Sequence, residues 1–456
     1  MKHMHWFTLQ SCILLVPTNK GHLHTNLQVF CLRWKEYHMS KSSRRNILAF
    51  GVGAGVAGLA APALAATFGN PDEPPQGIMN TKGNPRSAFD PGPQNPALSR
   101  QFPGTFTPPA TDVGSLPEFW ASFNNAPRRV QAGGWARQVT QADFQVSTEI
   151  SGVNMRLDAG GIRELHWHQA AEWAFMTYGN ARVTCLDPSG RAYVADVKEG
   201  DLWYFPAGYP HSLQGLGPDG CEFIIAFDNG MASEYNTLLV TDWLTHTPPD
   251  VLAANFGVPA ETFSKMFTHD LWIFQGEVPG PLAADQAAVK NPKGPPPNPF
   301  TYSLGSGPIT RQTKGGFVQI ADSHNFKAST TVAAALVTVH PGGVREMHWH
   351  PNADEWQYYV KGSAQMTVFN TGPNAVTNNF QAGDIGYVKR NFGHYVKNVG
   401  NTDLVFLAIF KTDTYQNLAL SDWLTHTPPA LVEAHFNLSA QDIAKFPNNI
   451  PDVMPR

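Results

Sequence analysis

The chain has few charged residues and few cysteines. Only 15% of its 456 residues are Asp, Glu, Lys or Arg, the formal net charge is −4, and four residues are cysteine. This composition does not fit a disordered or coiled-coil protein, and nothing in it points to nucleic acid as a partner. The 40 glycines and 37 prolines instead favour a turn-rich, all-β fold, and the length suffices for two domains.

Long apolar runs are scarce too, and a run near the N-terminus is expected to be removed. Arg44-Arg45 precedes an apolar, Gly- and Ala-rich stretch that ends at Ala65-Ala66. This pattern predicts a twin-arginine export signal over residues 39–66. Such signals lie close to the start of a chain, so Met39 is the expected start and residues 1–38 are interpreted as translated upstream sequence. The mature protein is expected to be periplasmic or secreted, without a membrane segment.

Cleavage at that point would leave two cysteines, Cys185 and Cys221. Both lie in runs rich in β-branched and aromatic residues, 181–186 and 221–227, which predict strands. Buried thiols are therefore expected. A disulfide remains the alternative, because the predicted compartment is oxidising.

Segments rich in proline and glycine divide the remaining chain. Residues 67–128 have no hydrophobic periodicity and predict an extended arm, and seven prolines within 278–299 predict a semi-rigid linker. Two domains remain, at 129–277 and 300–456. Short helices are expected near the end of each, at 250–256 and 430–436.

The two domains repeat one another. The sequence His166-Trp167-His168 recurs at 348–350, and the octet Asp-Trp-Leu-Thr-His-Thr-Pro-Pro occupies both 242–249 and 422–429. The first histidine (166 and 348), a later histidine (211 and 394) and the octet aspartate (242 and 422) are offset by 182, 183 and 180 residues. Such constant offsets indicate a duplicated domain, and the short strand-like runs between them predict a β-sandwich or small barrel in each half.

Each half contains the donors of one metal site. Two histidines on alternate residues of a strand share a face and can chelate one ion, whereas the tryptophan between them points outward, towards an expected interface. With a carboxylate and a third histidine they form a mixed N/O set, which suits manganese or iron and leaves positions open for substrate. The predicted ligands are His166, His168, Glu172 and His211 in the first half, and His348, His350, Glu355 and His394 in the second.

The predicted export route favours manganese. Twin-arginine substrates cross the membrane already folded, so a weakly held ion can be inserted in the cytoplasm, away from competing zinc and copper. Two further histidines, His246 and His426, repeat within the octets, where each lies between two threonines. We interpret them as structural residues and not as ligands.

With these motifs in place, the chain from about residue 129 to 446 resembles the bicupin oxalate decarboxylases. The similarity includes whole runs, among them 153–157, 163–168 and 200–206. It implies a double-stranded β-helix, or jelly-roll barrel, in each half and one manganese ion per barrel. It also implies dependence on dioxygen, cleavage of oxalate to formate and CO₂, and assembly into trimers or dimers of trimers.

The resemblance also assigns roles beyond the ligands. Arg163 and Arg345, each three residues before the first histidine of its set, would contact oxalate. Residues 233–237 match a mobile lid in which Glu234 is the acid/base candidate, although Tyr235-Asn236 departs from the common form of the lid. In the second half, Ala408 stands where many relatives carry a glutamate, so catalysis is assigned to the first site.

Other functions remain compatible with these residues. An oxalate oxidase would make CO₂ and hydrogen peroxide at the same site, and Glu234 argues against it. A bicupin dioxygenase with a larger substrate, or a bicupin that binds metal or oxalate without turnover, are further alternatives. Storage bicupins lack the metal ligands that both halves of this chain carry. Trp167 and Trp349 are interpreted as interface packing residues, with electron transfer between subunits as the alternative.

Overall fold

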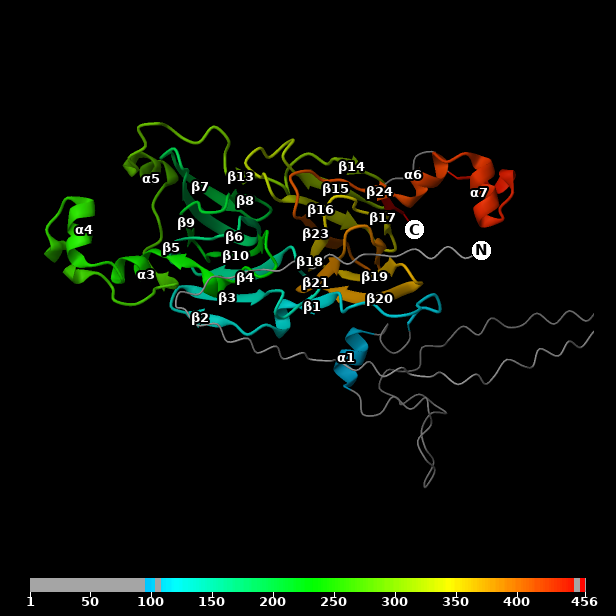
Figure 1. Ribbon diagram of the computed structural model, residues 1–456, viewed down its shortest axis with the longest axis horizontal. Helices are drawn as coiled ribbons and strands as arrows, with labels where there is room; N and C mark the ends of the chain where they lie inside the picture. The colour runs from blue at the N-terminus through cyan, green and yellow to red at the C-terminus, as the bar shows by residue number, and fades with distance from the viewer. Residues whose placement is uncertain (1–94, 103–107, 447–451, 456) are drawn as a thin grey trace, which may run out of the picture. The chain divides into compact units, whose positions relative to one another are not determined.

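A computed structural model describes residues 95–102, 108–446 and 452–455. The predicted upstream sequence (1–38), the predicted export signal (39–66) and residues 67–94 of the predicted arm lie outside this part of the chain. The described residues are mostly β, with a few short helices (Figure 1), which confirms the predicted fold class. Within them, no helix combines the length and apolar character needed to cross a bilayer.

The first half is one antiparallel sheet that curls into a barrel. Its longest strand, β6 (Glu172–Leu186), pairs with two strands along its first part and with two others along its second part. The strand bends near Gly179, where φ is 71° and an added Cβ would lie 2.1 Å from a backbone oxygen. The other strands of this half are β2 (Arg129–Gln131), β3 (Gly134–Val139), β4 (Ser151–Leu157), β5 (Gly161–Trp167), β7 (Ala192–Lys198), β8 (Leu202–Phe205), β9 (His211–Gly215), β10 (Cys221–Phe227), β11 (Leu238–Leu239) and β12 (Ile273–Gln275).

The second half repeats this plan with two sheets. One sheet contains β14 (Arg311–Gln312), β15 (Gly316–Ala321), β16 (Ala333–Val339), β18 (Glu355–Lys361), β21 (Asp384–Val388) and β23 (Leu404–Phe410). The other contains β17 (Val344–Trp349), β19 (Ser363–Asn370), β20 (Asn374–Gln381), β22 (Gly393–Asn398), β24 (Leu418–Ala419) and β25 (Val453–Met454). Buried apolar residues of the longer strands, such as β16 and β23, form the core of the barrel.

Short strands cross between the predicted domains. From the predicted arm, β1 (Trp120–Ser122) pairs with β21 of the second half, and Asp112 accepts hydrogen bonds from the backbone N–H and hydroxyl of Thr377. In the other direction, β13 (Thr301–Tyr302) pairs with β8 of the first half. The domain limits drawn from the sequence stay a prediction, and strand pairing ties the two barrels together across them.

The two barrels also share apolar packing. The core of the first half continues into buried residues of the second, including Trp356 and Leu407. Trp356 packs so closely on Gly152 that an added Cβ there would lie 2.5 Å from the indole ring. Glycine at 152 therefore allows a large aromatic side chain to fill the boundary between the barrels.

Both helices expected near the domain ends are confirmed. They are α4 (Pro249–Phe256) and α7 (Pro429–Phe436), and each has proline at its first position, where the missing N–H costs no hydrogen bond. They project from the barrels in Figure 1. The remaining helices are α1 (Pro96–Gln101), η1 (Phe123–Asn125), η2 (Glu234–Asn236), α3 (Val240–Thr245), η3 (Ala260–Lys265), α5 (Leu282–Ala288), α6 (Leu420–Thr425) and α8 (Ala440–Ile443).

The predicted linker, 278–299, contains helix α5 and packs on the first barrel. Buried Arg182 on β6 donates to the backbone oxygen of Gly280 and to Asp285 in α5. The alanine-rich stretch between the prolines has good helix propensity, which an interpretation based on proline content overlooks. This part of the linker is therefore anchored to the barrel.

Both described cysteines are free and buried, as predicted. Cys185 lies on β6 and Cys221 on β10, and neither forms a disulfide. Burial raises the pKa of the Cys221 thiol to about 12 and shifts that of Cys185 upward as well. The thiols are therefore protonated packing residues at neutral pH.

Candidate active site

The four predicted ligands of the first half come together inside the barrel. His166 on β5 lies opposite His211 on β9 in the strand register, His168 follows the end of β5, and Glu172 begins β6. All four side chains are buried, and one donor atom from each lies within 4.8 Å of the others. The alternating strand places the two histidines of His166-Trp167-His168 on one face, as predicted.

Hydrogen bonds orient these donors. The Nδ1 atoms of His166 and His211 lie 2.6 and 2.8 Å from the backbone oxygens of Glu164 and Tyr209. The Nε2 atom of each ring is therefore the nitrogen that can bind a metal ion. The indole N–H of Trp203 donates to Glu172 Oε1 at 2.8 Å. Such outer partners fix the ligand orientation in metal sites.

The donor set fits a divalent ion. Glu172 Oε2 lies 3.2 and 3.3 Å from Nε2 of His168 and His211. The buried Nε2 of His168 has no hydrogen-bond partner of regular geometry among the described residues. Three imidazoles and one carboxylate converging in a buried space form a mixed N/O metal site.

The second half builds an equivalent site. The Nδ1 atoms of His348, His350 and His394 lie 2.7 to 3.1 Å from backbone oxygens. Glu355 Oε2 lies 3.0 and 2.8 Å from Nε2 of His350 and His394, and again all donors lie within 4.8 Å. The residue that hydrogen-bonds the ligand carboxylate differs between the sites. Gln357 donates to Glu355 Oε1, whereas the indole of Trp203 donates to Glu172 in the first site. The chain therefore has two metal-binding His/Glu sites.

Burial sets the protonation of these histidines. It lowers the pKa of His166, His168, His348 and His350, and neighbouring imidazoles or the nearby arginines lower it further. Burial raises the pKa of Glu172, but His211 and His168 outweigh it and bring the pKa below its usual value. His166, His168, His348 and His350 are therefore neutral at neutral pH, and Glu172 is ionised, which are the forms that bind metal.

These shifts predict how the metal-free protein responds to acid. The unfolded chain binds protons at its imidazoles below their ordinary pKa near 6.5, whereas His166, His168, His348 and His350 in the folded chain do not, because their pKa is lowered. Stability of the metal-free protein should therefore fall as the pH drops from 7 to 5. Thermal unfolding of chelator-treated protein at each pH measures this. The variant His166→Gln/His348→Gln should lose less stability over the same range, and an equal loss would contradict the assignment.

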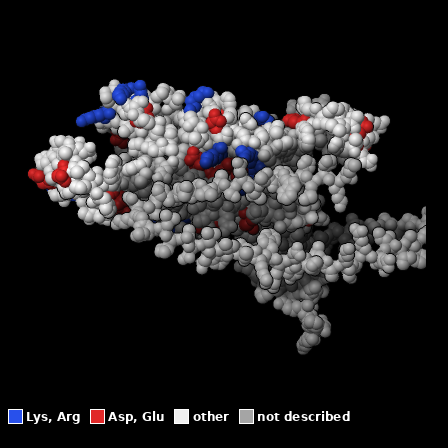
Figure 2. Space-filling view, viewed as in Figure 1, with Lys and Arg blue, Asp and Glu red and all other residues white. Residues whose placement is uncertain are grey.

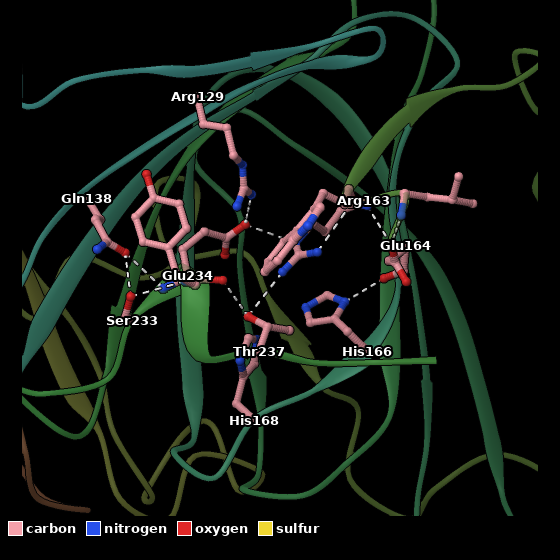
Figure 3. A network of polar contacts seen from close by, with 12 residues as sticks. Arg129, Gln138, Arg163, Glu164, His166, His168, Ser233, Glu234 and Thr237 are labelled. Carbon is pink, nitrogen blue, oxygen red and sulfur yellow. Dashed lines mark hydrogen bonds and ion pairs between the residues drawn. The ribbon is translucent and has the colours of Figure 1, made fainter. Parts of the chain in front are cut away.

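A buried ion-pair network adjoins the first site. The Arg163 side chain on β5 is almost fully buried, and its Nε lies 3.2 Å from Oε1 of the buried Glu234. Arg129 on β2 reaches the same oxygen at 2.7 Å, and Figure 3 shows the two arginines approaching Glu234 from different sides. Burial lowers the pKa of Arg163, while the charges of Glu234 and Glu172 oppose that shift. Arg163 thus interacts electrostatically with both the predicted lid and the metal ligands.

Glu234 is held in a closed position by its own segment. It begins the 3-10 turn η2, which Ser233 caps by accepting the Tyr235 N–H. The Glu234 N–H and the Ser233 hydroxyl both donate to Gln138 Oε1, and the Thr237 hydroxyl donates to the Glu234 backbone oxygen. The predicted lid, 233–237, therefore closes over the barrel with its carboxylate buried.

The second site lacks this arrangement. Ten residues connect Phe227 to Leu238 in the first half, but only seven connect Phe410 to Leu418 in the second. In that shorter loop, the Tyr415 hydroxyl accepts a hydrogen bond from Arg345 at 2.9 Å. Arg345 also donates to Glu346 and to the backbone oxygen of Asp452. Ala408 lines the small cavity there, and Glu355 is the only carboxylate among the described lining residues.

Two other repeated features lie away from the metal sites. His246 is largely exposed and its ring contacts the Asp242 backbone oxygen at the end of α3, and His426 makes the equivalent contact with Asp422. Trp167 packs edge-on against Trp243, and Trp349 against Trp423. These contacts agree with the structural role predicted for the histidines.

Three residues of the site were missed by sequence reasoning: Arg129, Gln138 and Trp272. None lies in a repeated motif, and each reaches the lid through tertiary contacts. The guanidinium of Arg129 lies 4.2 Å from the centre of the Trp272 ring, and that of Arg163 lies 5.3 Å from it. One signal was available in the sequence, because the duplication aligns Arg129 with Arg311.

Comparisons with known proteins agree with this geometry. A family model for cupins matches residues 122–263 and 302–444. The oxalate decarboxylase OxdC of Bacillus subtilis is 50% identical over 365 residues, which cover 80% of this chain and 92% of that protein. An oxalate decarboxylase of Arthroderma benhamiae is 35% identical over 424 residues, covering 86% and 96%.

A solved structure of the Bacillus subtilis enzyme, from work on its Mn(II) centres, superposes with a TM-score of 0.78. It is 48% identical in sequence, and the match covers 80% of this chain and 96% of that structure. Fold, duplicated ligand sets and sequence identity over most of the chain lead to one family. The chain belongs to the cupins and, among them, to the bicupin oxalate decarboxylases.

Proposed function

We propose that the protein converts oxalate to formate and CO₂ in a manganese- and dioxygen-dependent reaction at its first metal site. The observation that carries this proposal is the buried pair of Glu234 and Arg163 beside that site. A charged anchor and a proton carrier then lie together where a substrate would bind the metal. Among the described residues that line the cavity of the second site, Arg345 is present but the only carboxylate is the ligand Glu355.

The reaction needs both residues. Oxalate is a dianion, and its C–C bond breaks reluctantly because the departing carbanion is unstabilised. A manganese ion held by His166, His168, Glu172 and His211, together with dioxygen, would supply a reversible one-electron oxidation of oxalate that eases loss of CO₂. The electron would return to the remaining fragment before formate leaves, so the conversion is redox-neutral overall. Arg163 anchors one substrate carboxylate by charge-assisted hydrogen bonds. Because the dianion has no proton to give, Glu234 carries the proton that is added to the carbon that becomes formate, and it takes up a new proton from solvent before the next turnover.

The geometry of both groups suits these roles. The Nε atom of Arg163 is buried and has no hydrogen bond of regular geometry among the described residues, so it can donate to an incoming anion. Both arginines contact Oε1 of Glu234, and no described residue hydrogen-bonds Oε2, which is then the oxygen that exchanges the proton. The closed lid excludes water, which favours protonation of the intermediate over its oxidation.

Manganese is the proposed metal of both sites. The three-imidazole, one-carboxylate set suits it, and the similar Bacillus subtilis enzyme has Mn(II) centres. The proposed periplasmic or secreted location, with folded export after metal loading, rests on the sequence alone.

One assay tests the proposed reaction. Manganese-loaded protein is given oxalate in the presence of dioxygen, and formate and hydrogen peroxide are measured together. Decarboxylation predicts one formate per oxalate and little peroxide. Peroxide without formate would identify an oxidase. The absence of both products would indicate a protein that binds oxalate without turnover. Either result would overturn the proposal.

We also propose that the chain forms a homo-oligomer, a trimer or a dimer of trimers. Large apolar side chains are exposed in the helical segments after each barrel, including Trp243 (65%), Phe256 (55%), Trp423 (61%) and Phe436 (51%). Figure 2 shows mostly uncharged surface on the projecting segments at both sides of the view. Exposed apolar surface of this kind is typical of subunit interfaces.

Light scattering on the purified protein tests the assembly. Wild type is expected to have the mass of three or six chains, and Phe256→Glu/Phe436→Glu is expected to be smaller because it places charge on both segments. Phe369→Glu changes a similarly exposed phenylalanine (54%) on β19 and should keep the wild-type mass. A monomeric wild type would contradict the proposal.

A further inference from the structure

We propose that Arg129 is a positioning residue, which holds the Glu234 carboxylate in place while Arg163 binds the substrate. The inference rests on the proposed function, because it assumes that an anionic substrate enters the first site. Its structural basis is the pair of arginines that share one carboxylate oxygen. Arg129 lies outside the metal-ligand motifs and outside the predicted lid.

The shared contact is unequal. Arg129 donates from Nη2 to Glu234 Oε1 at 2.7 Å, while Arg163 reaches the same oxygen from Nε at 3.2 Å, without regular hydrogen-bond geometry. The Arg163 side chain is 1% exposed and lies next to the metal ligands, whereas that of Arg129 is 19% exposed. The stronger contact therefore comes from the arginine that lies nearer the solvent.

Aromatic side chains hold Arg129 against the lid. Its guanidinium lies 4.2 Å from the Trp272 ring centre and 5.2 Å from that of Tyr235 in the lid. Trp272 has φ of 52°, which is unusual for a tryptophan and persists only where surrounding contacts enforce it. Glu164 enforces it by accepting the Trp272 N–H, while its own N–H donates to the Trp272 oxygen. The ring is thereby fixed beside both arginines.

The charges explain why a second arginine is needed. Oxalate brings two negative charges and competes with Glu234 for Arg163. Without another cation, the buried Glu234 carboxylate would lose its ion pair and face the substrate's repulsion, which favours opening of the lid. Arg129 stays paired with Oε1 of Glu234 while oxalate is bound. Oε2 of the same carboxylate then remains in position to transfer a proton to the substrate.

The second half provides an internal comparison. Arg311 on β14 occupies the position of Arg129, since Arg129 pairs with Ala136 and Arg311 pairs with Val318, both 182 residues apart. Arg311 donates to Asp452, which stands where the first half has Trp272, and not to a loop residue. Both halves thus have the arginine, but only the proposed catalytic half directs it to a lid carboxylate.

Arg129→Ala in the manganese-loaded full chain tests this role. We expect kcat for formate to fall about tenfold or more, because a small misplacement of a catalytic group has effects of that size, with KM within twofold. Hydrogen exchange of the amides in 233–237 should become roughly tenfold faster, as expected for loss of a charged hydrogen bond. Arg129→Lys keeps the charge and should restore most of both properties.

Arg128→Ala is the matched control. Arg128 is the preceding residue, is exposed, and lies over Trp135 instead of the lid, so wild-type kcat and exchange are expected. In a Glu234→Ala background, Arg129→Ala should add no further lid exchange, because the ion pair is already absent. An added increase there would overturn the proposal.

The outcomes separate this inference from the proposed function. Wild-type lid exchange and kcat in Arg129→Ala would overturn it, as would a rise in KM alone, which would make Arg129 a substrate contact. If the wild type forms no formate, the proposed function fails, and lid exchange still decides whether Arg129 holds Glu234. Manganese content and thermal unfolding verify that each variant is folded, and Arg129→Lys serves if the alanine variant is not.

Discussion

Replacing Glu234 with alanine is expected to lower formate production from oxalate by about 100-fold or more, which is the usual contribution of a positioned acid/base group. Manganese content should stay at the wild-type level, because Glu234 is not among the ligand sets. Part of the remaining turnover should appear as hydrogen peroxide, since the intermediate no longer receives its proton. Formate, peroxide and metal are measured on the same preparation.

Thr414→Ala is the matched control for that variant. Thr414 occupies the place of Glu234 in the shorter loop of the second half, four residues before Leu418 as Glu234 is before Leu238. Its hydroxyl contacts only the neighbouring Asp413 carboxylate among the described residues, so wild-type formate production is expected. Normal formate production by Glu234→Ala would show that the lid carboxylate is not the proton carrier.

Removing a ligand from the first site should have an equally large effect. Glu172→Ala deletes the carboxylate that lies between His168 and His211. Loss of an outer partner alone costs about 10- to 100-fold in metal affinity or activity, so loss of a direct ligand should exceed about 100-fold. The variant is expected to retain one manganese ion per chain, in the second site, and to form almost no formate.

Metal analysis with formate measurement checks this prediction. Glu172→Asp shortens the same ligand and should recover part of the metal and part of the activity together. Wild-type turnover by Glu172→Ala, with the first site free of metal, would show that the reaction takes place outside the first site.

The metal sites could be predicted from sequence because their ligands follow local rules. Two histidines on alternate strand residues must share a face, so His166 and His168 were expected to converge. The distant His211 was found through the repeat, which supplied a second copy with the same offsets. In the strand register, His211 indeed lies opposite His166.

The surroundings of Glu234 could not be predicted in the same way. Arg129 reaches the lid because β2 pairs with β3 at one edge of the sheet, and Trp272 reaches it because β12 pairs with β5. These contacts depend on long-range strand register, which a single sequence does not specify. The φ of 52° at Trp272 has no local sequence cause either, since it is enforced by the buried Glu164.

The strand exchange between the barrels was missed for a related reason. β1 and β13 are only three and two residues long, and both lie in stretches without clear periodicity. Their pairing comes from partners in the other half. The helix in the linker was missed because flanking prolines dominated its composition, although the six residues after Leu282 favour a helix.

The central claim is that the first site, with Glu234, performs the reaction, while the second site binds metal without turnover. The most direct measurement is the formate produced per oxalate by Glu355→Ala, with manganese occupancy, stability and oligomer mass determined on the same sample. One formate per oxalate at a rate within a few-fold of wild type, with the first site filled, is the predicted result. Loss of formate while the first site, the fold and the assembly remain intact would contradict the claim and make the second site catalytic.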